Sequence, residues 1–390
     1  MSGSLREQVS LYIHVPFCAR KCEYCAFYSE PTTSGLSDRY TAALIRELEL
    51  TSAGHHDTPH TVFFGGGTPS LLSLSQWERI FGAMQRFGFL GANEWTVECN
   101  PATVSLDKAR LLRSHGVNRI SMGVQSLDSD LLNRLGRVHS RDMVFRSFDT
   151  LRQAGFDNIN IDLMFAIPGQ TMAIWRDTLN EALAMGSEHL SCYEVIYEED
   201  TPLFRQLRAG EFDVDEDLAC AMYERLLERA ASAGLEQYEV ANFARRGTAP
   251  HEGLPRFACR HNINYWRGGQ FDGLGPSACG YRNGVRTRNW ADTIRYSEQL
   301  ERGVRPVESR EALPPLARAG EIAAFGLRMN SGWSFDEFQR RTGYDLRQDW
   351  SAEMDELVGR GWGWRGMGGF RLTTPGLRFA DSAAECFLKP

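Results

Sequence analysis

The sequence predicts an α/β fold built as a partial (βα)6 barrel of the TIM type, followed by a smaller C-terminal unit. Six short apolar runs rich in Val, Ile and Phe alternate with amphipathic stretches over the first 200 residues, as parallel strands linked by helices do. Six such units leave the barrel open on one side, and barrels of this type carry their chemistry at the carboxyl ends of the strands.

The six predicted strands are short and mostly bounded by glycine, proline or asparagine. Their apolar residues run almost without interruption, which is typical of parallel strands buried on both faces. Polar residues and glycines cluster where several of these runs end, so we expect the functional site there. The predicted strands cover residues 11–15, 61–67, 95–101, 119–126, 158–169 and 189–197.

Three stretches between the strands repeat their apolar residues with the period of an amphipathic helix. Ser37 or Asp38 is expected to cap the first of them. Gly155 and Gly186 stand where a glycine commonly ends a helix, after the second and the third. The three predicted helices cover residues 36–50, 140–155 and 172–186.

The rest of the chain is less regular and changes character near residue 305. A helix is expected near 215–233, and the segment around it extends the barrel. We therefore predict a partial barrel at 1–200, a barrel extension at 201–304 and a C-terminal unit at 305–390.

The C-terminal unit has the element order of a winged helix. Helix-like residues at 335–343 and 351–361 precede a glycine-containing hairpin within 362–376. A DNA-binding winged helix would carry a basic surface, but this unit holds 12 Lys and Arg against 12 Asp and Glu. We therefore expect a packing or dimerisation unit with no nucleic-acid partner.

The composition predicts a cytoplasmic protein. The formal net charge is −7, which argues against a general binder of nucleic acids or anionic membranes. No apolar run approaches the roughly 20 residues of a membrane span, and the first residues lack the apolar stretch of a signal peptide. Nine cysteines, three of them close together, do not suggest a disulfide framework, so we expect metal ligands or small buried side chains.

The stretch CARKCEYCAF places Cys18, Cys22 and Cys25 within eight positions. Three thiolates at this spacing suit zinc or an iron–sulfur cluster. A structural zinc site has four ligands, and the fourth would have to be His14 or a remote cysteine. A 4Fe–4S cluster held by three cysteines keeps one iron open for chemistry, and this interpretation is favoured over zinc and over ordinary buried cysteines.

Polar motifs follow several of the predicted strands. The glycines of FFGGGTPS, residues 63–70, let the backbone approach a ligand closely, although a plain strand-to-helix turn also explains them. A charged residue inside an apolar strand, as Asp162 is, favours function over packing. Glu98 and Gln125 also stand at strand ends, whereas Arg137 fits either a site residue or a solvated helix residue.

The spacing C-x3-C-x2-C after a first strand resembles the signature of the radical S-adenosylmethionine (SAM) superfamily. The resemblance implies that SAM occupies the open iron of the cluster and that the reduced cluster can cleave SAM to a 5′-deoxyadenosyl radical. It also implies contacts with SAM for the residues at matching positions, which are Tyr12, Tyr24, Gly66, Gly67, Thr68, Glu98, Gln125, Arg137 and Asp162.

Within that superfamily, residues 11–290 resemble the subgroup of the oxygen-independent coproporphyrinogen III oxidases and the HemW haem chaperones. The oxidases carry a further cysteine where this chain has Phe27, and a long extension where only ten residues precede LYIHV. The run CRHNINYWRGG, which includes His261, resembles the H-N-x-x-Y-W motif of the chaperones. The resemblance therefore favours a haem chaperone over a decarboxylase.

The chaperone resemblance implies haem as cargo and acceptor haemoproteins as partners, with peripheral membrane contact at an acceptor and a homodimer as further expectations. His261 is a candidate haem ligand and Cys259 a rival one, while Tyr265 and Trp266 are candidates to stack on the macrocycle. An alternative is that the motif only pins a loop against the barrel mouth. The candidate partners of the haem propionates are Arg245, Arg246 and Arg260.

Three other functions stay open on the sequence alone. They are oxidative decarboxylation of coproporphyrinogen III, a zinc protein without redox chemistry, and a radical SAM enzyme with an unrelated substrate. No residue is assigned a catalytic role.

Overall fold

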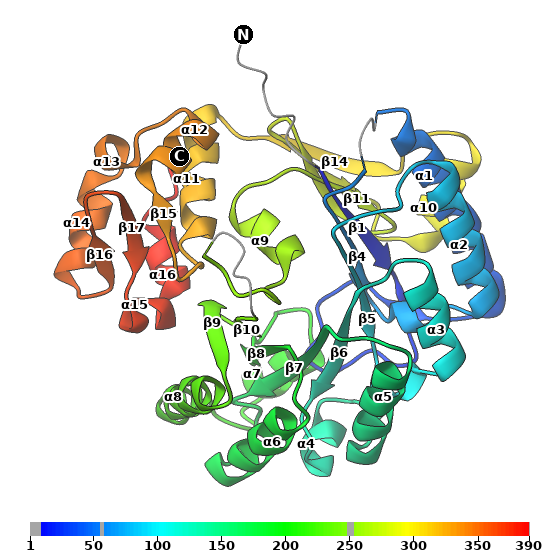
Figure 1. The fold of residues 1–390 in the computed structure, drawn as a ribbon, viewed down its shortest axis with the longest axis horizontal. Coiled ribbons are helices and arrows are strands. Elements are labelled where there is room, and N and C mark those ends of the chain that lie inside the picture. The colour runs from blue at the N-terminus through cyan, green and yellow to red at the C-terminus, as the bar shows by residue number, and fades with distance from the viewer. Residues whose placement is uncertain (1–8, 55–57, 248–252, 390) are drawn as a thin grey trace.

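The protein is described by a computed structural model that covers residues 9–54, 58–247 and 253–389. The six predicted strands lie side by side in chain order at the centre of a 12-stranded sheet, and each pair of neighbours among them is parallel (Figure 1). They are β1 (Ser10–Val15), β4 (Thr61–Gly66), β5 (Glu94–Cys99), β6 (Arg119–Gln125), β7 (Ile159–Phe165) and β8 (His189–Glu194).

Helices cover the outer side of these strands (Figure 1), and their apolar faces form the main core against the sheet. Trp77 and Trp175 are fully buried in this core. Gly155 and Gly186 follow the ends of two helices with φ angles of +89° and +72°, which confirms that these glycines stop them. The helices are α1 (Ser34–Ser52), α2 (Leu74–Arg86), α3 (Leu106–Ser114), α4 (Ser129–Arg134), α5 (Arg141–Gln153) and α6 (Met172–Ala184).

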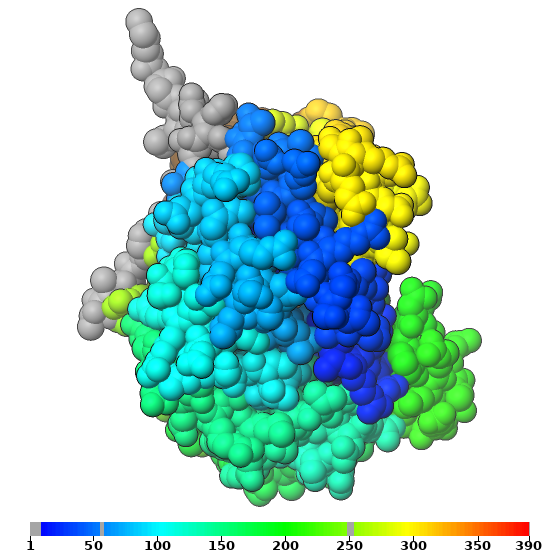
Figure 2. Space-filling view, turned by 90° about the vertical axis from the view of Figure 1, so that its right-hand side faces the viewer, coloured from blue at the N-terminus to red at the C-terminus, as the bar shows by residue number. Residues whose placement is uncertain are grey.

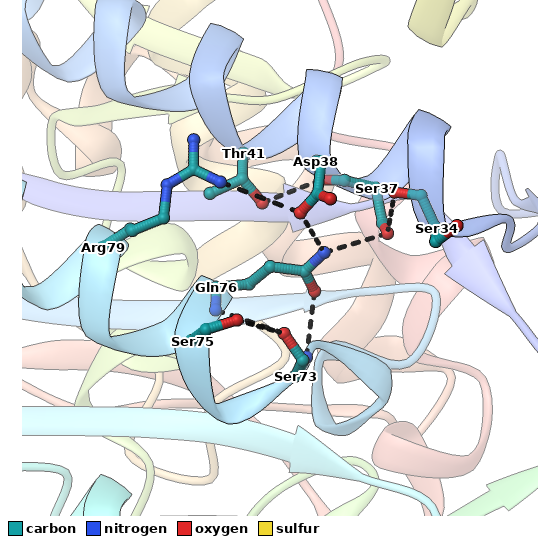
Figure 3. Close-up of polar contacts among 8 residues, drawn as sticks. All are labelled: Ser34, Ser37, Asp38, Thr41, Ser73, Ser75, Gln76 and Arg79. Atoms are coloured by element: carbon teal, nitrogen blue, oxygen red, sulfur yellow. Dashed lines mark hydrogen bonds and ion pairs between the residues drawn. The ribbon is translucent and has the colours of Figure 1, made fainter.

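The predicted cap of α1 is wrong, because the helix begins one turn earlier at Ser34. Figure 3 shows that Ser37 and Asp38 instead face α2, where Gln76 Nε2 donates to Ser37 Oγ and to Asp38 Oδ1, each at 2.9 Å. Gln76 also completes the capping box of α2 with Ser73. Ser37 and Asp38 therefore link α1 to α2 and do not cap α1.

Further strands extend both edges of the parallel sheet. β11 (Phe271–Leu274) pairs in parallel with β1, and the strands that follow it are antiparallel. The two outer edges of the described sheet do not pair with each other, so the barrel is open, as predicted. The remaining strands of this sheet are β9 (Leu235–Glu239), β10 (Asn242–Arg245), β12 (Cys279–Arg282), β13 (Val285–Asn289) and β14 (Val307–Ala312).

The helices of this extension include the one expected near 215–233, which is α8 (Glu216–Ser232). α9 carries the H-N-x-x-Y-W motif and lies inside the curve of the sheet (Figure 1). Part of the loop before it, 248–252, lies outside the described residues. The other short elements are β2 (Phe17–Cys18), β3 (Glu30–Pro31), η1 (Pro69–Leu71), η2 (Pro101–Thr103), α7 (Pro202–Arg208), α9 (Arg260–Trp266) and α10 (Thr293–Glu301).

The C-terminal residues form a separate hydrophobic core around Trp333 and Trp350. The two helices predicted from the sequence, α12 and α14, precede an antiparallel hairpin in the order expected of a winged helix, with the short α13 between them. The unit lies beside the open side of the barrel (Figure 1). Its elements are α11 (Pro315–Gly326), β15 (Trp333–Ser334), α12 (Phe335–Thr342), α13 (Leu346–Asp349), α14 (Ser351–Gly359), β16 (Gly363–Arg365), β17 (Gly369–Leu372), α15 (Thr374–Arg378) and α16 (Ala380–Glu385).

A buried carboxyl group joins the barrel to its extension. Glu47 of α1 accepts hydrogen bonds from Gly275 N at 2.8 Å, Asn289 Nδ2 at 2.8 Å and the Tyr296 hydroxyl at 2.6 Å. Burial raises the pKa of Glu47 to about 7. In Figure 2, α1 in blue lies against the yellow segment that contains α10, and the two helices are in contact.

Among the described residues, no helix has both the length and the apolar character of a membrane span.

Candidate cofactor site

A cavity of ≈ 740 Å³ opens at the carboxyl ends of the parallel strands. Its walls are the loop of three cysteines and the ends of β4 to β8. Tyr12 and His261 are not among the residues that line it. The predicted site residues that do line it are Cys18, Cys22, Cys25, Tyr24, Gly66, Gly67, Thr68, Glu98, Gln125, Arg137 and Asp162.

The three cysteines share one loop and none is in a disulfide. A backbone hydrogen bond from Cys25 N to Cys22 O, at 3.3 Å, holds the last two in a turn. The Thr68 hydroxyl lies 3.6 Å from Cys18 Sγ, and Arg137 Nη1 donates to Cys22 Sγ at 3.6 Å. Two of the three sulfur atoms therefore already face a hydrogen-bond donor, as the sulfur ligands of an iron–sulfur cluster commonly do.

The donor set of this loop fits an iron–sulfur cluster, because it consists of soft thiol groups that all line one cavity. Burial raises the pKa of Cys25 to about 11, so the thiolate that would bind iron needs the positive charge of the metal to form at neutral pH. In the part of the chain that the structure describes, no group of three or more His, Cys, Asp or Glu side chains is placed to hold a single metal ion.

The glycine run after β4 packs directly on the cysteine loop. Gly67 N donates to Val15 O at 2.8 Å, and Thr68 N donates to Phe17 O at 2.7 Å. A Cβ atom on Gly67 would lie 2.7 Å from the carbonyl oxygens of both Val15 and Phe17. The absence of a side chain therefore lets two backbone segments meet and sets the position of Cys18 next to them.

Two acidic side chains line the cavity from β5 and β7. Glu98 Oε2 accepts a hydrogen bond from Gly66 N at 3.2 Å, while Asp162 accepts from Ser121 Oγ at 3.0 Å and from Asn160 Nδ2 at 2.7 Å. Burial, with a further contribution from Asp162, raises the pKa of Glu98 to about 8. Burial also raises the pKa of Asp162. In the empty cavity burial thus favours the protonated form of both carboxyl groups, whereas a bound cationic group would favour their ionised form.

Arg137 is a cavity residue and not a solvated helix residue. It follows α4 in an irregular segment, and its Nη2 donates to Gly123 O at 2.5 Å. Its Nε atom is buried without a hydrogen-bond partner in the structure. Gln125 beside it has a φ angle of +66°, a strained backbone conformation for a residue with a side chain. An unpartnered donor and a strained residue at the same wall are features that a bound ligand would explain.

Tyr12 lies outside the cavity lining even though it stands on the first strand. Its hydroxyl is 3.1 Å from His14 Nδ1, and its ring packs near Phe63 and His261. The other nitrogen of His14 bonds to Tyr28 O at 2.8 Å. Tyr12 therefore contacts the interior of the barrel beneath the glycine run, and the structure gives it no direct place in the cavity.

His261 does not line the cavity, and both of its ring nitrogens have hydrogen-bond partners. Its side chain is buried, with Nδ1 2.7 Å from Thr61 Oγ1 and Nε2 2.7 Å from the Tyr265 hydroxyl, so both ring nitrogens are occupied. Burial lowers its pKa to about 3. Glu94 accepts from the backbone nitrogens of Arg260 and His261 and holds the first turn of α9.

The motif therefore pins α9 against the barrel, but at a different end from the one expected. Thr61 and Glu94 are the first residues of β4 and β5, whereas the cysteines lie at the carboxyl ends of the strands. Cys259 is buried at the same end, and burial raises its pKa to about 12. These residues are a structural anchor on the side of the barrel away from the cavity.

Two arginines proposed for the propionates are already engaged. Arg245 donates to Ser187 O at 3.0 Å, and Arg246 Nε lies 2.9 Å from Glu236 Oε2. The first contact links the extension to the barrel, and the second links two parts of the extension. An arginine in such a contact must break it before it can pair with a propionate.

Sequence reasoning missed the apolar rim of the cavity. Phe27 and Ile196 are 68% and 67% exposed, Val138 is 47% exposed and Tyr193 is 40% exposed, and all four line the cavity. They come from three separate segments, because Tyr193 and Ile196 share one, so no local pattern connects the whole set. Only the structure shows that these large apolar side chains are exposed and grouped at one opening, a feature that commonly marks a binding surface.

Comparison with known proteins gives the class first. Residues 12–182 match the family model of the Radical SAM superfamily. The coproporphyrinogen III oxidase HemN of Escherichia coli has the same fold, with a TM-score of 0.84 at 22% sequence identity over 98% of this chain and 90% of that chain. The open barrel and the three-cysteine loop are thus those of a radical SAM protein, a class that implies a 4Fe–4S cluster and SAM.

The particular family follows from two curated relatives. The haem chaperone HemW of Bacillus subtilis is 34% identical over 90% of this chain and 92% of its own length. The haem chaperone HemW of Lactococcus lactis is 32% identical over 98% of both chains. This chain belongs to the HemW family.

Proposed function

We propose that this protein is a haem chaperone, which binds haem and passes it to acceptor haemoproteins. The observation that carries the proposal is its similarity to two HemW chaperones over at least 90% of each chain. Such coverage includes the barrel, the extension and the C-terminal unit, so the likeness is not limited to the cofactor-binding part. Phe27 supports the proposal, because the oxidases that resemble this chain carry a cysteine there.

In this proposal the thiolates of Cys18, Cys22 and Cys25 hold a 4Fe–4S cluster, and SAM occupies the cavity beside them. When bound together, the cluster and SAM supply radical chemistry. Glu98 would hold the SAM ammonium group, because a nearby cation lowers a raised carboxyl pKa and favours the carboxylate that accepts its hydrogen bonds. Arg137 uses its unpartnered Nε toward the SAM carboxylate, and Asp162 accepts from hydroxyl groups.

We place the haem at the apolar rim of the cavity and not at α9. The rim side chains, Phe27, Val138, Tyr193 and Ile196, offer an open apolar surface to a flat macrocycle. His261 is buried with both nitrogens bonded, so ligation there would require α9 to leave its place. The rim therefore gives haem a surface without rearrangement of the barrel.

The test is an anaerobic haem titration of the cluster-reconstituted protein, followed by absorbance. We expect saturable one-to-one binding, transfer to an apo-haemoprotein, and no conversion of coproporphyrinogen III in the presence of SAM and a reductant. Weak binding that does not saturate would overturn the chaperone proposal. SAM-dependent formation of protoporphyrinogen IX without haem retention would identify a decarboxylase instead.

A further inference from the structure

A continuous chain of hydrogen bonds crosses the barrel interior from α9 to the cavity. Cys259 N donates to the Tyr238 hydroxyl at 3.0 Å, and this hydroxyl lies 2.8 Å from His189 Nε2. His189 Nδ1 lies 2.6 Å from Asn160 Oδ1, and Asn160 Nδ2 donates to Asp162 Oδ1 at 2.7 Å. Only Asp162, at the end of the chain, lines the cavity.

The two ends of this chain define its direction. Asp162 accepts from Asn160 Nδ2, so Asn160 Oδ1 faces His189. The proton of a neutral His189 is therefore on Nδ1, and Nε2 accepts from the hydroxyl of Tyr238. At the other end a backbone N–H can only donate, so the oxygen of Tyr238 accepts from Cys259. Every donor consequently points toward Asp162.

The central amide has no other orientation available. Asn160 Oδ1 also accepts from Ser191 Oγ at 3.0 Å, and Nδ2 also donates to Ser121 Oγ at 2.7 Å. All four of its hydrogen-bonding positions are filled, and Ser121 donates in turn to Asp162. A fully satisfied buried network of this kind allows one arrangement and disfavours the rest.

His189 is held in its neutral form by its surroundings. It is completely buried, as Asn160, Tyr238 and Cys259 nearly are. Burial, with the positive charge of Arg119 nearby, holds the pKa of His189 well below its ordinary value. A neutral imidazole has one N–H and one lone pair, as the directional chain requires.

We propose that His189 and Tyr238 are positioning residues for the ligand of the cavity: through Asn160 they orient the Asp162 carboxylate toward SAM and connect it to α9. This inference rests on the proposed contact of Asp162 with SAM. It gives the buried H-N-x-x-Y-W segment an effect on the cavity without any contact between α9 and the cofactor. Packing alone would not need this chain, since apolar side chains fill a barrel interior at no desolvation cost.

The first test removes one oxygen atom, the Tyr238 hydroxyl, from the chain of hydrogen bonds. The variant Tyr238→Phe, with its cluster reconstituted, is expected to bind SAM about five- to tenfold more weakly in equilibrium dialysis without reductant, as loss of one link in a hydrogen-bond network predicts. The control is Tyr296→Phe, because the Tyr296 hydroxyl is also buried but donates to Glu47 at 2.6 Å. We expect the control to lower thermal stability and leave SAM affinity unchanged.

Equal SAM affinities in Tyr238→Phe and the wild type would overturn the inference, and so would an equal loss of affinity in both variants. Asp162→Asn separates this failure from that of the proposed site. If Asp162→Asn weakens SAM binding and Tyr238→Phe does not, the site stands and the positioning role falls. If Asp162→Asn also leaves the affinity unchanged, both assignments are wrong.

A second measurement reports the direction of the hydrogen bonds at His189. In protein labelled with 15N-histidine and holding an oxidised cluster, NMR is expected to show His189 as the neutral tautomer with its proton on Nδ1. A proton on Nε2 would overturn the inferred direction and with it the proposal. The tautomer thus tests the direction of the hydrogen bonds, and the SAM affinity of Tyr238→Phe tests whether they position the ligand.

Discussion

At the scale of single residues, the same side chain takes different chemical properties from its place in the barrel. Cys18, Cys22 and Cys25 are on a partly exposed loop at the cavity, whereas Cys192 is buried between strands. Burial raises the pKa of Cys192 well above that of a free thiol, so it behaves as a small apolar side chain. The sequence groups the first three by spacing, and their exposure agrees with a ligand role.

Replacement of Cys22 by Ala should abolish cluster assembly, because the two remaining thiolates cannot hold the cluster stably. Iron and acid-labile sulfide in anaerobically reconstituted protein measure this directly. The matched control is Cys220→Ala, since Cys220 is an exposed cysteine on α8. Full iron and sulfide content in Cys22→Ala would refute the ligand assignment.

The carboxyl of Glu98 should make stability depend on pH. Its pKa is raised from 4.5 to about 8 by burial, so burial favours the protonated form. Its contribution to stability is therefore complete below pH 4.5 and is lost as pH rises through about 8. Without SAM, the wild type should lose free energy of unfolding relative to Glu98→Gln, on the order of 3 kcal/mol between pH 5 and 8.

Urea denaturation of both proteins across that pH range tests the Glu98 prediction, since other titrating groups cancel in the difference. Parallel pH profiles would show that Glu98 is ionised in the empty cavity. SAM should reverse the trend, because its ammonium group favours the carboxylate.

At the scale of elements, α9 shows how a recognisable motif can serve the fold. Its spacing places His261 and Tyr265 one turn apart, where their side chains bond to each other. We expect His261→Gln to lower the free energy of unfolding by about 1–3 kcal/mol, through loss of buried hydrogen bonds. Haem affinity and the haem absorbance spectrum should stay close to those of the wild type. Loss of the haem spectrum with unchanged stability would return axial ligation to His261.

The apolar rim of the cavity leads to a separate prediction about haem affinity. Phe27→Ser and Ile196→Ser should each weaken haem binding about tenfold, the loss expected when one large apolar contact is removed. Both side chains are exposed in the protein, so stability should change little. Ile294→Ser on α10 is the control, because Ile294 is 52% exposed but does not line the cavity. A similar loss of affinity in the control would argue against a specific rim.

At the scale of the whole molecule, one carboxyl group holds the extension on the barrel. Glu47→Ala leaves the partners of that carboxyl on Gly275, Asn289 and Tyr296 without it, and we expect a loss of about 2–4 kcal/mol in the free energy of unfolding. Glu49→Ala on the same helix should cost less than about 0.5 kcal/mol, because Glu49 is exposed. Chemical denaturation measures both losses. Equal losses of free energy of unfolding in Glu47→Ala and Glu49→Ala would show that the hydrogen bonds of Glu47 are not important to stability.

Much of this architecture could be predicted because it depends on local patterns. The alternation of apolar runs and amphipathic stretches located all six parallel strands within a few residues and the open barrel they form. The α1 cap could not be predicted, because Ser37 and Asp38 bond to Gln76 on another helix. The rim and the chain from Cys259 to Asp162 were missed for the same reason, since their members are far apart along the sequence.

Local patterns in the sequence were enough to predict the fold class, the family and eleven of the residues that line the cavity. Strand periodicity, cysteine spacing and glycine runs act over a few residues, so they can be read in order along the chain. The contacts of His261 could be known only from the folded protein, because the barrel brings Thr61, Glu94 and Tyr265 to one end. Burial and hydrogen-bond partners come from the whole fold, and at His261 they favour a role as an anchor of α9 over one as a haem ligand.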